Sequence, residues 1–223
     1  MDDLSVSTER RDFLGSMAFS AAVAGLAVAT ANPSPALAAD APVTPFTRWL
    51  DSIAGTQRLL LDVREPVDGL AFAWAWVYLL TGAQAYGIPE SELGTVMVFR
   101  HNGLPFAFED ALWKKYKLGE HFKINDPVTK EPAVRNPHYL KSDPPLLPDM
   151  AMQKLIDRGV KVAVCDMAIH VHSGIIAKEM GLKHEEVKKE WMEATLPKIV
   201  HVPSGIVAIQ GAVSRGCSYV YAG

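Results

Sequence analysis

The stretch "KVAVCDMAIHVHSG", Lys161 to Gly174, decides the fold and contains the first candidate for chemistry. It begins as a short apolar run rich in valine, which is typical of a buried strand. Cys165 ends this run, and Asp166 directly after it is a suitable N-cap for a following helix. A strand that passes into a helix is the repeating unit of a parallel sheet covered by helices. Cys165 is therefore expected at the point where a strand ends and a helix begins.

The same alternation of short apolar strands and helical segments continues along most of the chain. Because such strands are apolar on both sides, they favour a mostly parallel sheet with both faces covered. The sequence therefore predicts a three-layer α/β/α fold with a sheet of about five strands. Strands are expected at residues 57–63, 94–100, 160–165, 198–202 and 217–222.

Two other segments have an unusual composition. Residues 67–87 form a long apolar stretch, and its length and bounding glycines favour a helix that is buried all round, partly at a subunit interface. Residues 120–147 contain five prolines and show no clear period. Turn-forming pairs such as Asp126-Pro127 favour an ordered arm over a mobile linker in this segment.

Residues 1–38 are expected to be a cleaved twin-arginine export signal. Arg10 and Arg11 precede a short, weakly apolar run, and the small residues of Ala36 to Ala38 suit a signal peptidase. An uncleaved membrane anchor is the alternative, but two prolines interrupt the apolar run just before the cleavage site. The sequence therefore predicts export to a bacterial periplasm, with no stable membrane anchor after cleavage.

After cleavage, residues 39–55 are expected to be an N-terminal linker and residues 56–223 a single α/β domain with the arm at 120–147. The whole chain has 22 basic and 25 acidic residues, so its charges nearly balance. This balance argues against binding to nucleic acid or to an acidic membrane surface.

The chain has two cysteines, Cys165 and Cys217. A structural disulfide is the first interpretation in an oxidising compartment. Cys165 ends a predicted strand and Cys217 begins the last one, so a parallel sheet places them at opposite edges, roughly 17 Å apart. A disulfide spans about 7 Å between Cα atoms, so no bridge is expected if the last strand is parallel. Cys217 is then a buried, structural thiol.

Cys165 is the candidate nucleophile, because the positive end of a helix dipole favours the thiolate. Asp166 opposes this effect, and a buried core cysteine is the alternative. His170, one turn later, is the candidate acid, base or hydrogen-bond donor. His170 and His172 are alternative metal ligands, but on a helix they point about 200° apart, which disfavours a joint site with Cys165. No metal or cofactor is therefore expected.

A group of polar residues is expected at the same edge of the sheet as Cys165. Backbone amides and a guanidinium group suit an anionic ligand, so a small anionic or sulfur-containing ligand is expected here. The alternatives are a simple turn at Asn102 and a solvated His101. The candidate ligand-binding residues are Arg100, His101, Asn102 and the helix cap Ser204.

The segments "GVKVAVCDMAIHVHSG" and "LPKIVHVPSGIVAIQGAVSRGCSYVYAG" are similar to the C-terminal half of the DsrE/DsrF-like (sulfur-relay) superfamily. In that family a cysteine follows the corresponding strand, and the domain ends with a similar proline-serine-glycine pattern. The resemblance covers roughly residues 57–222, interrupted by the arm. It implies a three-layer α/β/α fold, assembly into homo- or hetero-oligomers, and a persulfide on Cys165. The export signal and the segments "RHNG…WKKYKLGE" and "RNPH" indicate a twin-arginine-exported subgroup.

Three functions follow from these features. The first is a periplasmic sulfur (persulfide) carrier or transferase, which requires a free and accessible Cys165. The second is a non-catalytic periplasmic module that binds a small ligand or a metal and forms a homo-oligomer. The third is a structural or partner protein whose contacts are made by the apolar helix and the arm.

Overall fold

A five-stranded sheet forms the centre of the domain, and its strands are all parallel in the order β4-β3-β2-β1-β5. The computed structural model of the chain describes residues 43–141 and 149–223. Each predicted strand is found within one residue of its expected bounds, so the predicted parallel sheet is confirmed. The strands are β1 (Gln57–Val63), β2 (Leu93–Phe99), β3 (Lys161–Cys165), β4 (Ile199–Val202) and β5 (Ser218–Tyr221).

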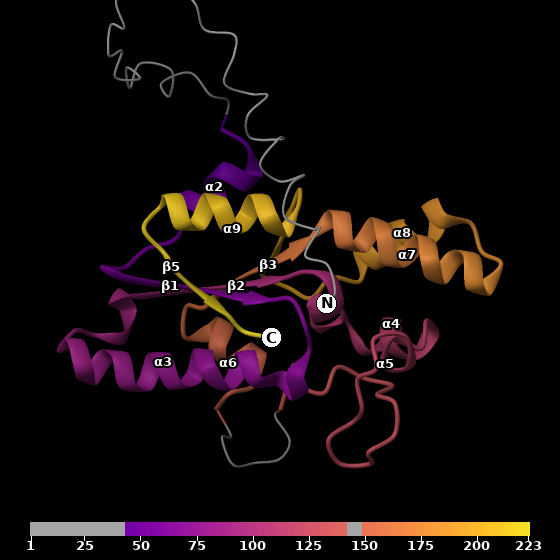
Figure 1. The fold of residues 1–223 in the computed structure, drawn as a ribbon, viewed down its shortest axis with the longest axis horizontal. Helices are drawn as coiled ribbons and strands as arrows, with labels where there is room; N and C mark the ends of the chain where they lie inside the picture. The colour runs from indigo at the N-terminus through magenta and orange to yellow at the C-terminus, as the bar shows by residue number, and fades with distance from the viewer. Residues whose placement is uncertain (1–42, 142–148) are drawn as a thin grey trace, which may run out of the picture. The chain divides into compact units, whose positions relative to one another are not determined.

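Helices cover both faces of the sheet, which confirms the three-layer architecture (Figure 1). One face carries α2 (Pro45–Asp51) and α9 (Gly205–Ser214), and the other carries α3 (Leu70–Tyr86) and α6 (Met152–Asp157). The remaining helices lie towards the end of β3: α4 (Asp110–Lys115), α5 (Leu118–His121), α7 (Asp166–Met180) and α8 (His184–Glu193). Three short 3-10 helices join these elements: η2 (Val67–Gly69), η3 (Glu90–Glu92) and η4 (His101–Ala107).

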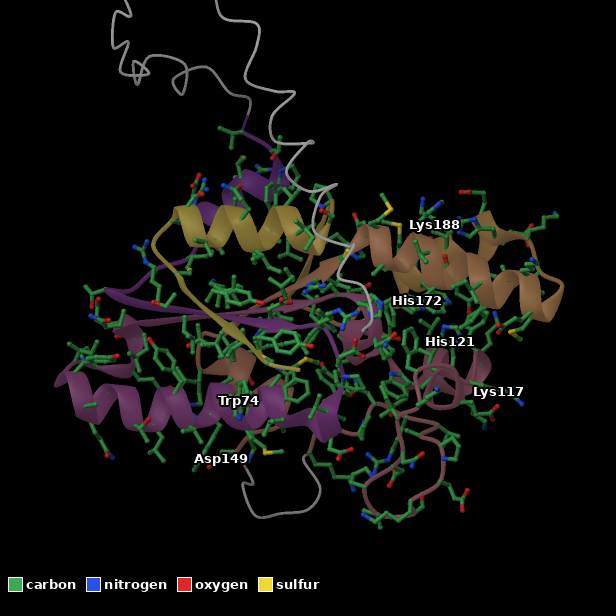
Figure 2. All side chains as sticks on the ribbon, viewed as in Figure 1. Trp74, Lys117, His121, Asp149, His172 and Lys188 are labelled. Carbon is green, nitrogen blue, oxygen red and sulfur yellow. The ribbon has the colours of Figure 1, made fainter. Side chains whose placement is uncertain are left out.

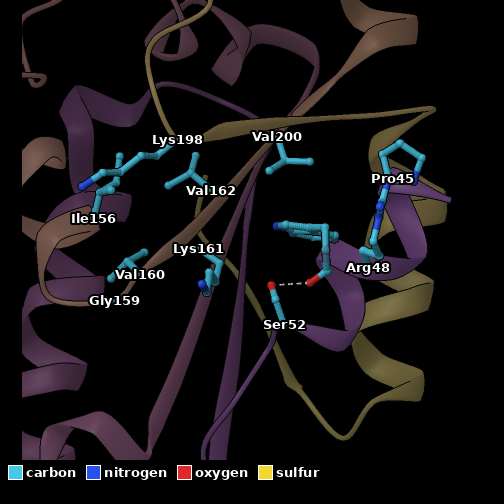
Figure 3. A pocket seen from close by; sticks show the side chains of 11 residues that line it. Pro45, Arg48, Ser52, Ile156, Gly159, Val160, Lys161, Val162, Lys198 and Val200 are labelled. Atoms are coloured by element: carbon cyan, nitrogen blue, oxygen red, sulfur yellow. Dashed lines mark hydrogen bonds between the residues drawn. The ribbon is translucent and has the colours of Figure 1, made fainter. Parts of the chain in front are cut away.

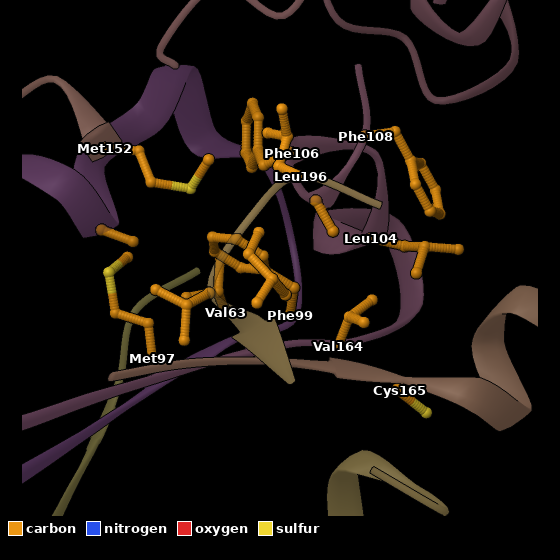
Figure 4. Packing of buried hydrophobic residues seen from close by; sticks show 14 of the residues in the cluster. Val63, Met97, Phe99, Leu104, Phe106, Phe108, Met152, Val164, Cys165 and Leu196 are labelled. Atoms are coloured by element: carbon orange, nitrogen blue, oxygen red, sulfur yellow. The ribbon is translucent and has the colours of Figure 1, made fainter. Parts of the chain in front are cut away.

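Each face of the sheet has its own apolar core, because successive side chains of a strand point to opposite faces. Leu60, Val96 and Ala163 pack with α2 and α9. Met97 and Val164 belong to the larger core on the other face, which contains most of the buried aromatic rings (Figure 4). No helix among residues 43–141 and 149–223 combines the length and apolarity needed to span a bilayer.

The apolar helix α3 is only partly buried within the single chain. Its inner side packs on the sheet through residues such as Phe72 and Leu79. Four large apolar side chains on it remain between 36% and 41% exposed, so the predicted burial of this side at a subunit interface stays a prediction: Leu70, Trp74, Val77 and Leu80.

The predicted linker, residues 39–55, is in part a helix. Residues 45–51 form α2, and Thr44 caps it by accepting a hydrogen bond from the backbone N–H of Thr47 at 3.1 Å. Trp49 and Leu50 are buried against α9 and the sheet. The domain therefore begins before residue 56, whereas the predicted export signal lies outside the described residues.

The proline-rich arm is ordered over the part that the structure describes. Asp126 accepts hydrogen bonds from the backbone N–H groups of Val128 and Thr129, which closes a turn. Asn136 is buried, and its amide donates to the carbonyl oxygen of Phe106 at 2.8 Å. Residues 122–141 are thus attached to the domain by turns and buried polar contacts, and residues 142–148 lie outside the described part.

Candidate functional site

Cys165 lies where the sequence predicts it, at the end of β3 and at the N-terminus of α7. Its Sγ accepts a hydrogen bond from the backbone N–H of Ala168 at 3.3 Å, so the thiol itself caps the helix. Val164 and Cys165 point to opposite sides of β3 (Figure 4). Ser204 caps α9 in the same way, with Oγ accepting from the N–H of Val207 at 3.3 Å. Each helix dipole favours negative charge at its N-terminus.

Both cysteines are free, and they lie at opposite edges of the sheet because β5 is parallel to β1. Cys217 is 5% exposed and burial raises the pKa of its thiol, as expected for a structural cysteine. Cys165 is 6% exposed. Cys165 therefore meets the requirement for a free thiol but not the requirement for an accessible one, and only a small reagent could reach it without a movement of the chain.

Arg100 follows β2, one position beyond the paired residues Phe99 and Val164, so the register places it beside Cys165. Its Nε and Nη2 donate hydrogen bonds to the two carboxylate oxygens of Asp62, both at 2.7 Å. Asp62 is only 1% exposed and also accepts from the hydroxyl of Tyr219 at 2.8 Å. These hydrogen bonds raise the pKa of Arg100. Asp62 thus occupies the place expected for an anionic ligand, and among the described residues the N–H groups of Nη1 and the second N–H of Nη2 are left for one.

A glycine at the start of α9 makes room for the side chain of Arg100. A Cβ atom at Gly205 would lie 2.7 Å from Cδ and 2.8 Å from Cβ of Arg100. Real Cβ atoms do not approach neighbours this closely, so Arg100 can cross the N-terminus of α9 only because residue 205 has no side chain. Gly205 and Asp62 are therefore parts of the site whose roles the sequence did not indicate.

His101 and Asn102 both contact the carboxylate of Glu65, in the loop after β1. The Nδ1 atom of His101 lies 3.3 Å from one oxygen of Glu65, and Nδ2 of Asn102 donates to the other at 2.7 Å. His101 has a left-handed backbone conformation with φ of 49°. Because this carboxylate is negatively charged, it disfavours an anionic ligand beside it. Both side chains stabilise the turn through Glu65, and their role as ligand-binding residues stays a prediction.

His170 and His172 contact different parts of the molecule. The ring of His170 packs on that of His184 in α8, with the ring centroids 4.7 Å apart. The carbonyl oxygen of His170 also accepts a hydrogen bond from Nε2 of His184 at 3.0 Å. Within the described residues, no hydrogen bond or ring contact joins His170 to Cys165, so its predicted part in proton transfer gains no support from the geometry.

His172 belongs to a cluster of three histidines that the sequence did not predict. Its Nδ1 lies 3.1 Å from Nε2 of His121 in α5, and the two rings are nearly perpendicular, with an interplanar angle of 89° (Figure 2). The ring centroid of His101 lies 6.1 Å away. Burial lowers the pKa of His172 to about 4, and the other two histidines contribute to this shift. In the part of the chain that the structure describes, no group of three or more His, Cys, Asp or Glu side chains is arranged to hold a metal.

Asp166, which follows the cysteine directly, is engaged with β4. Its Oδ1 lies 2.6 Å from Nδ1 of His201, and His201 pairs in register with Val164. The carboxylate thus has a neighbouring hydrogen-bond donor, which reduces its unfavourable effect on a Cys165 thiolate.

Comparison of the chain with protein-family models, with curated proteins and with solved structures finds no match. The interpretation of the site therefore depends on its own geometry. That geometry brings Cys165, Arg100 and Ser204 to one edge of the sheet, and within the described residues no hydrogen bond or ring contact joins them to His170.

Proposed function

We propose that the protein is a DsrE/DsrF-like periplasmic sulfur carrier or transferase that holds a persulfide on Cys165. The position of its Sγ, at the N-terminus of α7 and in a hydrogen bond with the N–H of Ala168, carries this proposal. A thiolate or a persulfide anion at this place is stabilised by the helix dipole and by a backbone donor. The resemblance of residues 159–174 and 196–223 to the superfamily supports the same role.

The reaction is an exchange at sulfur. The Cys165 thiolate attacks the sulfane sulfur of a small persulfide or polysulfide and forms a new bond between Sγ and that sulfur. The sulfur–sulfur bond of the donor breaks, and the rest of the donor leaves as a thiolate with the electron pair. No external oxidant or reductant is required, because one sulfur–sulfur bond replaces another. The low exposure of Cys165 favours a small donor, and the guanidinium of Arg100, which the register places beside Cys165, suits an anionic one.

The proposal includes export and self-association. Residues 1–38 have the features of a twin-arginine signal, and the compartment they imply is the periplasm. The exposed apolar side chains of α3 offer a surface for a homo-oligomer, since an apolar patch of this kind is typical of a contact surface.

Intact mass spectrometry of the folded protein before and after treatment with polysulfide tests the proposal. The wild type should gain the mass of sulfur, Cys165→Ser should not, and Cys217→Ser should behave as the wild type. Cys217 is the matched control because it is equally free and similarly buried. If folded protein gains no sulfur, or gains it on Cys217, the proposal fails, and a small-ligand or metal-binding oligomeric module becomes the better description.

A further inference from the structure

A cavity of about 490 Å³ lies at the amino-terminal edge of the sheet, the edge opposite to Cys165. Its volume suits a small organic molecule. In Figure 3, α2 residues Pro45 and Arg48 line one wall, and Ile156, Val160 and Lys198 line the other. The cavity is thus enclosed by α2 and by the first residues of β3 and β4.

Three cations line the cavity, while no acidic residue is part of the described lining. Lys198 is paired with Asp157, with Nζ and Oδ1 2.9 Å apart. Arg48 and Lys161 have no ion-pair partner within residues 43–141 and 149–223. The cavity therefore has a surplus of positive charge, which favours an anionic occupant.

Trp49 belongs to this lining through its ring, which is 5% exposed and packs in the core between α2 and the sheet. Its indole Nε1 is fully buried, so it is not open to a molecule in the cavity. The contacts for an anionic group are therefore those of the exposed cations, Arg48 and Lys161.

The apolar residues of the lining indicate that the ligand also has an apolar part. The walls include the side chains of Ile156, Val162 and Val200, and the ring of Trp49 belongs to the core between α2 and the sheet. Such walls favour a ligand with an apolar part, whereas an inorganic anion would leave the apolar side of the cavity empty.

We propose that this cavity binds a small organic anion with an apolar, ring-containing body and one carboxylate or sulfonate group. The anionic group pairs with Arg48 or Lys161, and the apolar part of the ligand covers the apolar walls. The site is separate from the proposed sulfur chemistry, because β3 places Lys161 and Cys165 at opposite ends, about 13 Å apart. Parallel α/β sheets bind ligands mainly at the carboxyl edge, so the fold alone does not predict this site.

Two fluorescent probes test the charge requirement. The first is 1-anilinonaphthalene-8-sulfonate, and the second is the neutral N-phenyl-1-naphthylamine, which has the same ring systems without the sulfonate. We expect saturable fluorescence enhancement by the sulfonate, with a dissociation constant on the order of 10 μM, and binding of the neutral probe roughly tenfold weaker. Equal affinities for the two probes, or a signal that does not saturate, would overturn the proposal.

Variants locate the binding. Lys161→Glu and Arg48→Glu should each weaken binding of the sulfonate by about tenfold. Lys114→Glu makes the same charge change at an exposed position of α4 outside the cavity and should have no effect. Equal affinities of Lys161→Glu and Lys114→Glu would disprove the site.

Circular dichroism of each variant verifies folding. Lys161→Glu and Arg48→Glu both alter exposed side chains, so each variant should keep the unfolding midpoint of the wild type. Cys165→Ser should bind the sulfonate as the wild type does. The result is thus independent of the polysulfide experiment, and either proposal can fail alone.

Discussion

Replacement of His172 by glutamine should make the stability of the protein less dependent on pH between about 4 and 6.5. In the folded protein, burial and the nearby rings of His121 and His101 lower the pKa of His172 from 6.5 to about 4. The unfolded chain has no such environment, so its imidazole takes up a proton as the pH falls through 6.5. Between these two values unfolding is therefore accompanied by proton uptake at His172.

Because the unfolded state binds the additional proton, acid favours unfolding. The free energy of unfolding is unaffected by His172 above pH 6.5 and decreases as the pH falls to about 4. A pKa lower by about 2.5 corresponds to about 3.4 kcal/mol, at roughly 1.36 kcal/mol per pH unit. The ring is only partly buried, and solvent screening reduces this value, so we expect about 1.5–2 kcal/mol.

Urea unfolding at pH 7.5 and pH 4.5, followed by circular dichroism, measures this difference. The wild type should lose about 1.5–2 kcal/mol more than His172→Gln over the interval. His121 also has a lowered pKa, caused mainly by burial, so His172→Gln should retain part of the pH dependence. If His172→Gln loses as much stability as the wild type, the reasoning from burial is refuted.

Two further predictions concern the edge of the sheet that carries the thiol. Arg100→Met should lower the free energy of unfolding by about 3 kcal/mol, because the buried carboxylate of Asp62 then keeps only the hydroxyl of Tyr219 as its described partner. Urea unfolding measures this loss. The double variant Arg100→Met with Asp62→Leu should recover part of the lost stability, because it also removes the buried charge. Cys165→Ser should change the free energy of unfolding by less than about 1 kcal/mol, because the serine hydroxyl can cap α7 as the thiol does. A larger loss with serine than with valine at this position would contradict the capping role.

The strands could be predicted because their signal is local. Each is a short apolar run bounded by turn or helix signals, and the parallel arrangement follows from the alternation of strands and helices. The position of Cys165 was predictable for the same reason, since it depends only on where β3 ends and α7 begins. The parallel sheet in turn placed Cys217 at the other edge.

The partners of the site residues could not be predicted, because they depend on packing between distant segments. Asp62 and Arg100 are separated by 38 positions, and His121 and His172 by 51. The apolar sequence of α3 gave no sign of its exposed side, since a helix that is apolar all round has no period from which to choose a face.

The two proposed sites lie at the two ends of β3, and the residues between them argue for independent action. Val162, Ala163 and Val164 are buried to 1% exposure or less, and their side chains alternate between the two cores. Close-packed side chains do not shift continuously, so a ligand beside Lys161 can influence Cys165 only through an element with two discrete arrangements. The described residues of β3 pair in regular register with both β2 and β4, which holds the strand on both sides and opposes such a change. Occupation of the cavity should therefore leave the reaction of Cys165 with polysulfide unchanged.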